Sequence, residues 1–351
     1  MTLFRENIDK MAAYVPGEQP AAGTRVVKLN TNENPYPPSP KAVAAMRELD
    51  PELLRRYPHP YAGPLREVAA RVLGVPAEWI IAGNGSDDLL AMIVLACADR
   101  GRKIVYPMPT YVLYRTLTDM QDATPVEVPF DEDFTLPVDA LLAEQGAVTF
   151  IASPNSPSGT LHSNERLEAL ASGLRGVLVI DEAYADFASG NAMELVRRHA
   201  NVVVLRTFSK GYSLAGLRLG FGVMQPGLVG GIDKVKDSYP VDAVACAVGT
   251  AAMADQEYKN ASCAKVVASR KVLAPQLAAM GLKVWPSESN FLLAGTADGR
   301  TAAPIYQALK GRGILVRYFD QDRLRDKLRI TVGTDQENAQ LVAALKDVLG
   351  G

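Results

Sequence analysis

Five short apolar runs alternate with amphipathic stretches between residues 79 and 208, and this alternation restricts the possible folds more than any other feature. The runs are WIIAG, RKIVYP, AVTFIAS, GVLVIDE and NVVVLRTF. Each is typical of a buried parallel strand, and the segments 164–173 and 190–200 are typical of crossover helices. The pattern predicts an α/β fold with a mostly parallel central sheet and helices on both faces.

The rest of the chain predicts an arm and a second domain. Residues 1–40 are rich in Pro, Asn and Gly, which favours an extended arm over a helix. Residues 251–351 open with a long helical pattern and continue with short strands and two further helices, which predicts a smaller α+β domain. Residues 41–250 would form the large domain, and a chain of 351 residues with 48% hydrophobic content is long enough for both.

The charge balance favours a small-molecule partner. The formal net charge of -2 comes from 37 basic and 39 acidic residues that are well interspersed, so no block offers the field that nucleic acid or an anionic membrane would need. The longest apolar run, 89–98, is about half the ~20 residues of a membrane span. Three scattered cysteines, Cys97, Cys246 and Cys263, lack metal-ligand spacing and indicate reduced thiols in a cytoplasmic protein.

Residues that directly follow the strands are the first candidates for a site, because ligands of open α/β sheets bind beyond the carboxyl ends of the strands. After WIIAG, Gly85 allows a tight turn, and Ser86 and Asp87 open a helical run. The free N–H groups of such a helix would face a phosphate. A capped turn without a ligand explains this motif equally well when it is taken alone.

Two further strand ends carry a carboxylate and a lysine. Asp181 follows GVLVI, and Lys210 follows NVVVLRTF after one helix-length crossover. Each residue alone is more typical of a solvated surface, but a right-handed β-α-β unit would place both at one edge of neighbouring strands. That pair suits pyridoxal phosphate, because the lysine amine can bind the cofactor covalently and the carboxylate can keep its ring nitrogen protonated.

Nearby residues meet the other needs of that cofactor. Tyr184 could hydrogen-bond the ring's phenolic oxygen, and Thr207, Ser209 and Arg218 lie close enough in sequence to Lys210 to bind a phosphate. Tyr111 could stack on the ring, although an aromatic residue after a strand is more often part of the packing.

With these residues in place, the chain resembles the fold-type-I aminotransferases and, within them, the histidinol-phosphate aminotransferases. The resemblance covers nearly the whole length. It rests on eight motifs in order: LNTNENPYPPSP (29–40), RYPHP (56–60), GNGSDD (83–88), SPNSPSG (153–159), DEAYADF (181–187), RTFSKGYSLAGLRLGFG (206–222), SNF (289–291) and LRITVGT (328–334).

The resemblance implies a role for each matching residue. Lys210 would carry the cofactor, Asp181 would pair with the pyridinium, and Tyr184 would bind the phenolic oxygen. The phosphate ligands would be Ser86, Asp87, Thr207, Ser209 and Arg218. A homodimer is implied, in which Tyr57 reaches the partner's cofactor. The substrate pocket would include Tyr14, Asn32, Asn290, Arg317 and Arg329. Either arginine could instead form a salt bridge at a strand edge.

One motif departs from the family pattern. Where the family commonly has Asn-Asn-Pro-Thr-Gly, this chain has Asn155-Ser156-Pro157-Ser158-Gly159. Ser156 therefore stands where an asparagine normally contacts the ring oxygen. Either Ser156 or a shifted Asn155 would supply that contact.

The resemblance implies transfer of an amino group between L-histidinol phosphate and 2-oxoglutarate, with glutamate as the donor, in histidine biosynthesis. One alternative is an aminotransferase for aromatic amino acids, because arginines that hold a phosphate can also hold a carboxylate. A second is a threonine-phosphate decarboxylase of the same fold. A third is a non-catalytic pyridoxal-phosphate protein, which would typically lack the lysine or carry a DNA-binding segment.

Overall fold

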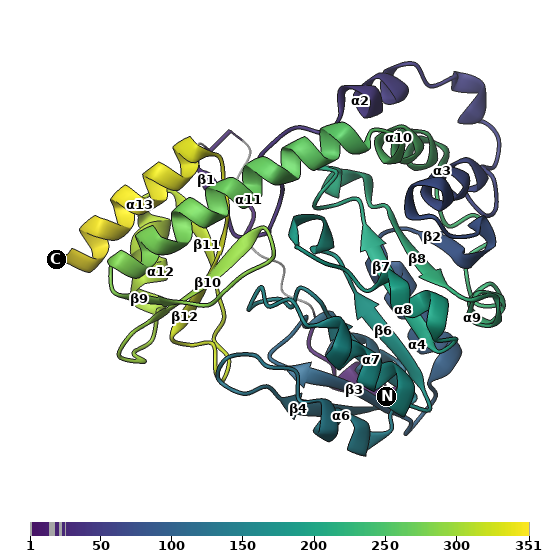
Figure 1. Cartoon of the computed structure of the whole chain (residues 1–351), viewed down its shortest axis with the longest axis horizontal. Coiled ribbons are helices and arrows are strands. Elements are labelled where there is room, and N and C mark those ends of the chain that lie inside the picture. Colours follow the sequence, from purple (N-terminus) through teal and green to yellow (C-terminus); the bar gives the residue numbers. More distant parts are fainter. Residues whose placement is uncertain (1, 14–17, 21–22, 25, 351) are drawn as a thin grey trace.

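The computed structural model describes residues 2–13, 18–20, 23–24 and 26–350, which form two lobes, each built on its own sheet (Figure 1). The larger sheet has seven strands. In spatial order they are β2 (Ile80–Gly83), β8 (Gly220–Met224), β7 (Val202–Thr207), β6 (Val177–Asp181), β5 (Val148–Ala152), β3 (Lys103–Met108) and β4 (Thr124–Pro129).

The expected α/β fold with a mostly parallel sheet is confirmed. The pairs β3/β4, β3/β5, β5/β6 and β6/β7 are all parallel. The exception is β8, which runs antiparallel between β7 and β2, so the WIIAG strand pairs only with an antiparallel neighbour. The sequence pattern missed β8 because its GFGVM run contains two glycines, and it missed β4 because Pro125 and Pro129 make that edge strand atypical.

Helices cover both faces of the larger sheet (Figure 1). They are α2 (Pro40–Arg47), α3 (Gly63–Leu73), α4 (Ser86–Cys97), α5 (Leu113–Met120), α6 (Val138–Glu144), α7 (Asn164–Gly173), α8 (Met193–Arg198), α9 (Pro226–Ile232) and α10 (Ala243–Ala254). Successive residues of one strand enter different cores: Leu178 and Ile180 of β6 pack into one cluster, and Val179 packs into the other. This is why the central strands are apolar at every position.

The smaller sheet has five strands in the order β1 (Val27–Leu29), β11 (Ile314–Tyr318), β12 (Lys327–Thr331), β10 (Phe291–Thr296) and β9 (Leu282–Val284). Helices α11 (Gln256–Ala279), α12 (Ala303–Gly311) and α13 (Asp335–Gly350) pack with it. The expected arm is not wholly extended, because it contains α1 (Glu6–Lys10). Its strand β1 pairs in parallel with β11.

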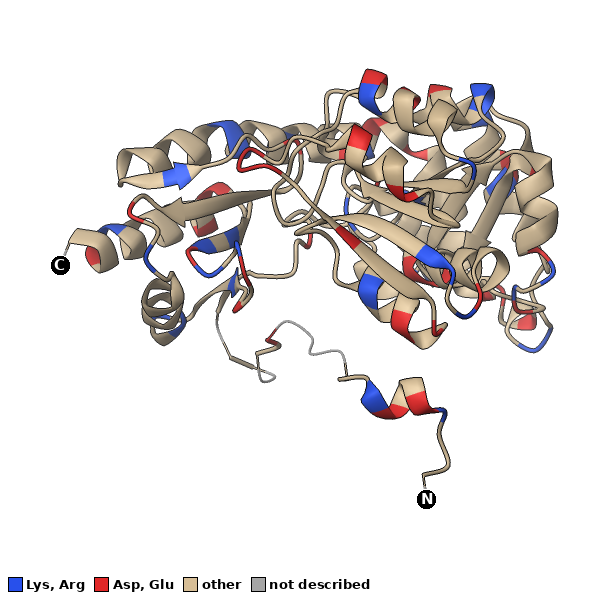
Figure 2. Cartoon of the chain, turned by 90° about the horizontal axis from the view of Figure 1, so that it is seen from below, with Lys and Arg blue, Asp and Glu red and all other residues tan. Residues whose placement is uncertain are grey.

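The long helix expected from residue 251 is divided at Asp255. That residue leaves the helical conformation (φ -101°, ψ 58°), and its carboxylate accepts hydrogen bonds from Ser39 and Lys41. The second part, α11, then runs from the larger lobe to the smaller one (Figure 1). Basic and acidic residues are interspersed over both lobes (Figure 2). None of the described helices is long and apolar enough to cross a membrane.

Candidate active site

Asp181 and Lys210 line one cavity of about 570 Å³ at the carboxyl end of the larger sheet. Asp181 is the last residue of β6 and lies opposite Leu205 of the parallel strand β7, which ends three residues before Lys210. The short crossover therefore brings the carboxylate and the amine together. The wall also includes residues of β11, β12 and the segment 30–33, so the cavity lies between the two sheets.

The Asp181 carboxylate is 5% exposed and is held by two donors. The Tyr114 hydroxyl donates to Oδ2 at 3.0 Å, and the Ala183 amide donates to Oδ1 at 3.2 Å. Tyr114 is fully buried, and its ring stacks on Phe150 with the centroids 4.7 Å apart. Burial raises the pKa of Asp181 to about 6, against the opposing effect of the Tyr114 hydrogen bond.

The Lys210 amine faces the backbone of the 30–33 segment. Its Nζ donates to the Thr31 carbonyl at 3.1 Å and lies 5.9 Å from the centroid of the Tyr184 ring. Burial, followed by the positive charge of Arg329, lowers the pKa of Lys210 to about 8, although the Glu33 carboxylate acts in the opposite direction. A substantial fraction of the amine is therefore neutral near physiological pH.

Tyr184 belongs to a hydrogen-bonded group that spans both sheets. The Asn32 amide donates from Nδ2 to the Tyr184 hydroxyl at 2.9 Å, and the Asn290 amide donates to the Asn32 carbonyl at 2.9 Å. The Tyr184 ring meets Phe291 edge to face, with centroids 5.0 Å apart. Burial raises the pKa of Tyr184, so its hydroxyl keeps its proton at neutral pH.

The start of α4 forms an anion-binding corner of the cavity. Gly85 precedes the helix with φ 90°, and no described side chain caps the first turn, so its N–H groups remain available. Ser86, Asp87, Thr207, Ser209 and Arg218 all line the cavity here. The Asp87 carboxylate would repel a phosphate, but it accepts hydrogen bonds from Tyr111 and Arg218, each at 3.2 Å. The group of Asp87 that could bind an anion is therefore its backbone N–H.

Two arginines line the opposite wall. Arg317 of β11 and Arg329 of β12 are register partners across an antiparallel pair. Both guanidinium groups lie over the Phe319 ring, at 5.2 and 5.6 Å from its centroid. Arg329 also donates to the Ser156 hydroxyl at 3.0 Å. Like charges directly opposite one another destabilise a strand pair, and an anion in the cavity would offset that repulsion.

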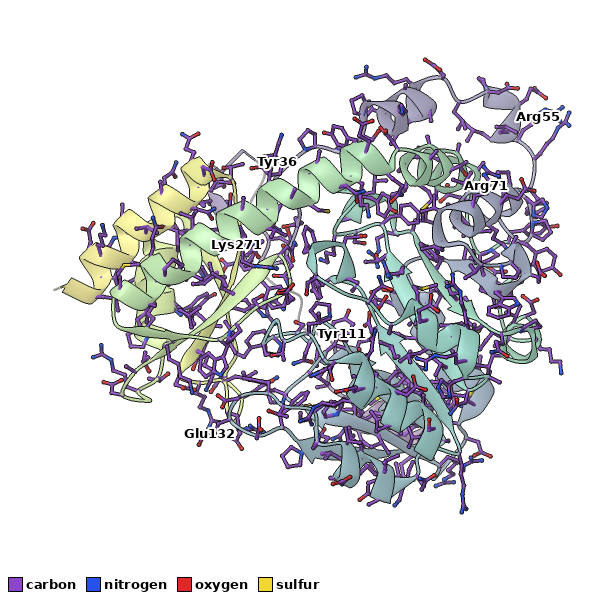
Figure 3. The ribbon with its side chains drawn as sticks, in the orientation of Figure 1. Tyr36, Arg55, Arg71, Tyr111, Glu132 and Lys271 are labelled. Atoms are coloured by element: carbon purple, nitrogen blue, oxygen red, sulfur yellow. The ribbon has the colours of Figure 1, made fainter. Side chains whose placement is uncertain are left out.

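The structure does not bring every expected site residue to the cavity. Tyr111 lies between the lobes, near the middle of Figure 3, and lines the wall. Among the described residues, the wall includes Ser156 but not Asn155, whose side-chain amide donates to the Pro109 carbonyl in the loop after β3 and to the Ser158 hydroxyl in its own loop. Gly85, Asn290 and Tyr57 are also outside the wall, and Tyr14 falls outside the described residues.

Several residues of the site were missed from the sequence. Tyr114 had a usable signal, because it follows Tyr111 by three positions and so shares its side of a helix turn. Thr31 and Glu33 lie inside the LNTNENP motif, but only the fold shows that the Thr31 carbonyl meets Lys210. Phe319 carried no signal beyond an aromatic residue next to a strand.

Comparison with known proteins identifies the family. The aminotransferase class I and II family matches residues 24–345 of this chain. The chain is 59% identical over 346 residues to histidinol-phosphate aminotransferase 1 of Trichormus variabilis, with 99% of each protein covered. It is 43% identical over 348 residues to the histidinol-phosphate aminotransferase of Geotalea daltonii, covering 99% of the chain and all of the relative.

This chain belongs to the class I and II aminotransferases. The resemblance expected from its eight motifs is thereby confirmed. A solved histidinol-phosphate aminotransferase from Sinorhizobium meliloti, in complex with pyridoxal-5'-phosphate, superposes with a TM-score of 0.91 at 29% identity, and the match covers 100% of this chain and 98% of that one. The protein is therefore an aminotransferase of fold type I.

Proposed function

We propose that this aminotransferase transfers an amino group between L-histidinol phosphate and 2-oxoglutarate, using pyridoxal phosphate bound at Lys210. The observation that carries the proposal is one cavity with Asp181 and Lys210 on one side and the paired Arg317 and Arg329 on the other. Its full-length relatives at 43 to 59% identity are named for this reaction. Both substrates have an anionic end that a guanidinium pair can hold.

The cavity fits the cofactor at each of its polar ends. The first turn of α4, together with Thr207, Ser209 and Arg218, offers donors for a phosphate. The buried Asp181 offers a carboxylate for the ring nitrogen. Tyr184 and Ser156 are the candidate partners of the phenolic oxygen, and we favour Ser156 over Asn155 because the Asn155 amide already donates to Pro109 and Ser158. Tyr111 could cover a ring face.

When bound, pyridoxal phosphate supplies an electron-accepting ring that stabilises negative charge at the substrate's α-carbon. Asp181 supports this by holding a proton at the ring nitrogen. Lys210 Nζ would take the α-proton and return it, and the burial that lowers the pKa of its amine favours the neutral form that can accept a proton. Because the amino group must pass through the enzyme between two half-reactions, ping-pong kinetics are expected.

We further propose that the enzyme is a cytoplasmic homodimer. The Tyr57 side chain is 82% exposed and stacks on Tyr239 at 4.5 Å, beside the exposed Leu53 and Leu54. An apolar patch of this kind is typical of a protein interface, and it supports a contact in which Tyr57 reaches the partner's cofactor. The free cysteines are consistent with a reducing compartment.

The two sheets support a division into an arm (1–40), a large domain (41–250) and a small domain (251–351). The strand β1 of the arm joins the small sheet, so the arm and the small domain would move together. The 30–33 segment that follows β1 would then carry Thr31 toward Lys210 or away from it.

A coupled assay tests the proposed reaction. The enzyme loaded with pyridoxal phosphate is given 2-oxoglutarate and either histidinol phosphate or phenylalanine, and glutamate formation is followed. We expect turnover with the phosphate ester, and loss of both this turnover and the visible absorbance in Lys210→Ala. No turnover of histidinol phosphate, faster turnover of phenylalanine, or release of carbon dioxide from threonine phosphate would each refute the assignment. Borohydride labelling of a residue other than Lys210 would refute the site.

A further inference from the structure

We infer that Thr331 is a positioning residue that makes Tyr184 a hydrogen-bond donor toward the cavity, acting through Asn32. The inference rests on the proposed function, because the group that would receive the proton is the phenolic oxygen of pyridoxal phosphate. Neither Thr331 nor its contacts could be assigned a role from the motif LRITVGT alone.

Thr331 is the last residue of β12, is 2% exposed, and contacts Asn32 twice. Its Oγ1 accepts a hydrogen bond from the Asn32 backbone N–H at 3.0 Å and donates to Asn32 Oδ1 at 3.0 Å. A backbone N–H can only donate, so the single hydroxyl hydrogen of Thr331 is available for Oδ1. In this arrangement the hydroxyl uses both its donor and an acceptor site.

The Thr331 contact decides which way the Asn32 amide faces. With Oδ1 on Thr331, Nδ2 faces the Tyr184 hydroxyl and donates to it at 2.9 Å. Tyr184 is then an acceptor for Asn32, and its own hydrogen is not used by Asn32 and can be donated on the cavity side, where the Ser156 hydroxyl also lies. If the amide were reversed, Oδ1 would draw the Tyr184 hydrogen, and the buried Thr331 hydroxyl would lose the acceptor it now has.

The Asn32 backbone is fixed independently of its side chain. Its φ of 57° is in the left-handed region, which asparagine tolerates better than most residues. The Asn290 amide holds the Asn32 carbonyl, and Thr331 holds the N–H. The edge-to-face contact with Phe291 holds the Tyr184 ring in place beside Asn32. If the Thr331 hydroxyl were removed, the Asn290 contact with the carbonyl would remain, whereas the Asn32 N–H and the orientation of its amide would both be released.

Thr331→Val keeps the shape of the side chain and removes the hydroxyl. Nothing then favours Oδ1 facing residue 331, and the amide can turn to accept the Tyr184 hydrogen. A donor at the phenolic oxygen stabilises the deprotonated, more negative form of the bound cofactor, so its loss raises the pH at which the visible absorbance titrates. We expect an upward shift of roughly one pH unit and roughly tenfold faster loss of cofactor on dilution.

Two matched variants separate this role from a structural one. Thr331→Ser retains the hydroxyl and should restore the wild-type titration. Thr149→Val makes the same change at a buried threonine of β5, whose hydroxyl has no hydrogen-bond partner among the described residues, and should leave the titration unchanged. If Thr331→Val does not fold, Thr331→Ala removes the hydroxyl without the branched methyl groups.

The decisive measurement repeats Thr331→Val in a Tyr184→Phe background. If Thr331 acts through Tyr184, the second substitution abolishes the shift, because no hydroxyl hydrogen remains to be redirected. An unshifted titration in Thr331→Val, or an equal shift in both backgrounds, would overturn the inference. Failure of the proposed function is distinguishable, because the wild-type enzyme itself would then show no visible absorbance dependent on Lys210.

Discussion

Replacing Tyr114 by phenylalanine should change the acidity of Asp181 more than any other single substitution that leaves the carboxylate in place. The hydroxyl donates to Asp181 Oδ2 at 3.0 Å in a fully buried setting. A hydrogen bond to a buried charged group is worth about 1.5–3 kcal/mol, which corresponds to about one to two pKa units. The pKa of Asp181, about 6 in the wild-type protein, should then rise to roughly 7–8.

The assay is the binding of pyridoxal phosphate to the apoprotein, followed by absorbance between pH 6 and pH 9. At pH 7 about nine-tenths of Asp181 is ionised in the wild type. In Tyr114→Phe the ionised fraction should lie between about one-half and about one-tenth. The ring nitrogen needs an anion at this position, so the apparent affinity at pH 7 should fall by about two- to tenfold. The difference should disappear near pH 9, where Asp181 is ionised in both proteins.

Tyr106→Phe is the matched control for this experiment. Tyr106 is a neighbouring buried tyrosine whose hydroxyl donates to Glu127 at 3.2 Å and not to Asp181. The control should shift neither the affinity nor its pH dependence. A loss of affinity in Tyr114→Phe that is equal at every pH would show that Tyr114 acts through packing alone, and the electrostatic reasoning would be wrong.

Three further predictions concern other parts of the protein. Gly85→Ala places a methyl group about 2.9 Å from the Arg218 guanidinium at a residue with φ 90°, so the affinity for the cofactor should fall. Gly101→Ala, at a similar φ of 76° but beside open space, should lower stability alone, and binding and melting curves distinguish the two effects. Burial lowers the pKa of His162 to about 4, so the unfolded chain binds a proton at this histidine before the folded protein does as the pH falls. About 3 kcal/mol of unfolding free energy should therefore be lost between pH 6.5 and pH 4 in the wild type but not in His162→Asn, as measured by denaturant titration. Arg317→Ala should raise the KM of both substrates by about 10- to 100-fold with a smaller effect on kcat, while Arg325→Ala, whose partners Asp320 and Asp322 lie in the same loop, should not.

The sequence was sufficient for five of the seven strands of the larger sheet and for the pair at its centre. Apolar runs reveal strands that are buried on both faces, and a crossover of one helix length fixes the neighbouring strand ends, so Asp181 and Lys210 could be paired without coordinates. The strand β8 could not be predicted in this way, because glycine gives it little apolar signal. Its Gly220 packs so closely against the start of α4 that a larger residue would not fit there.

The part of the site beyond that pair depends on contacts between distant residues. Asn32 and Thr331 are separated by 299 positions, and their two hydrogen bonds require β1 to enter the small sheet beside β11. No local pattern specifies that pairing. Tyr114 is the opposite case, since its spacing from Tyr111 was visible in the sequence but its partner was not.

The register of β11 and β12 gives a physical reason why one cavity would accept two different substrates. Arg317 and Arg329 lie directly opposite one another, and both are held against Phe319. An anion that lies between or beside them would offset their mutual repulsion. A phosphate and a distal carboxylate both meet that need, while the rest of each substrate differs. Recognition through the shared charge would therefore serve both half-reactions, and discrimination between the substrates must come from the cavity surfaces that contact their uncharged parts.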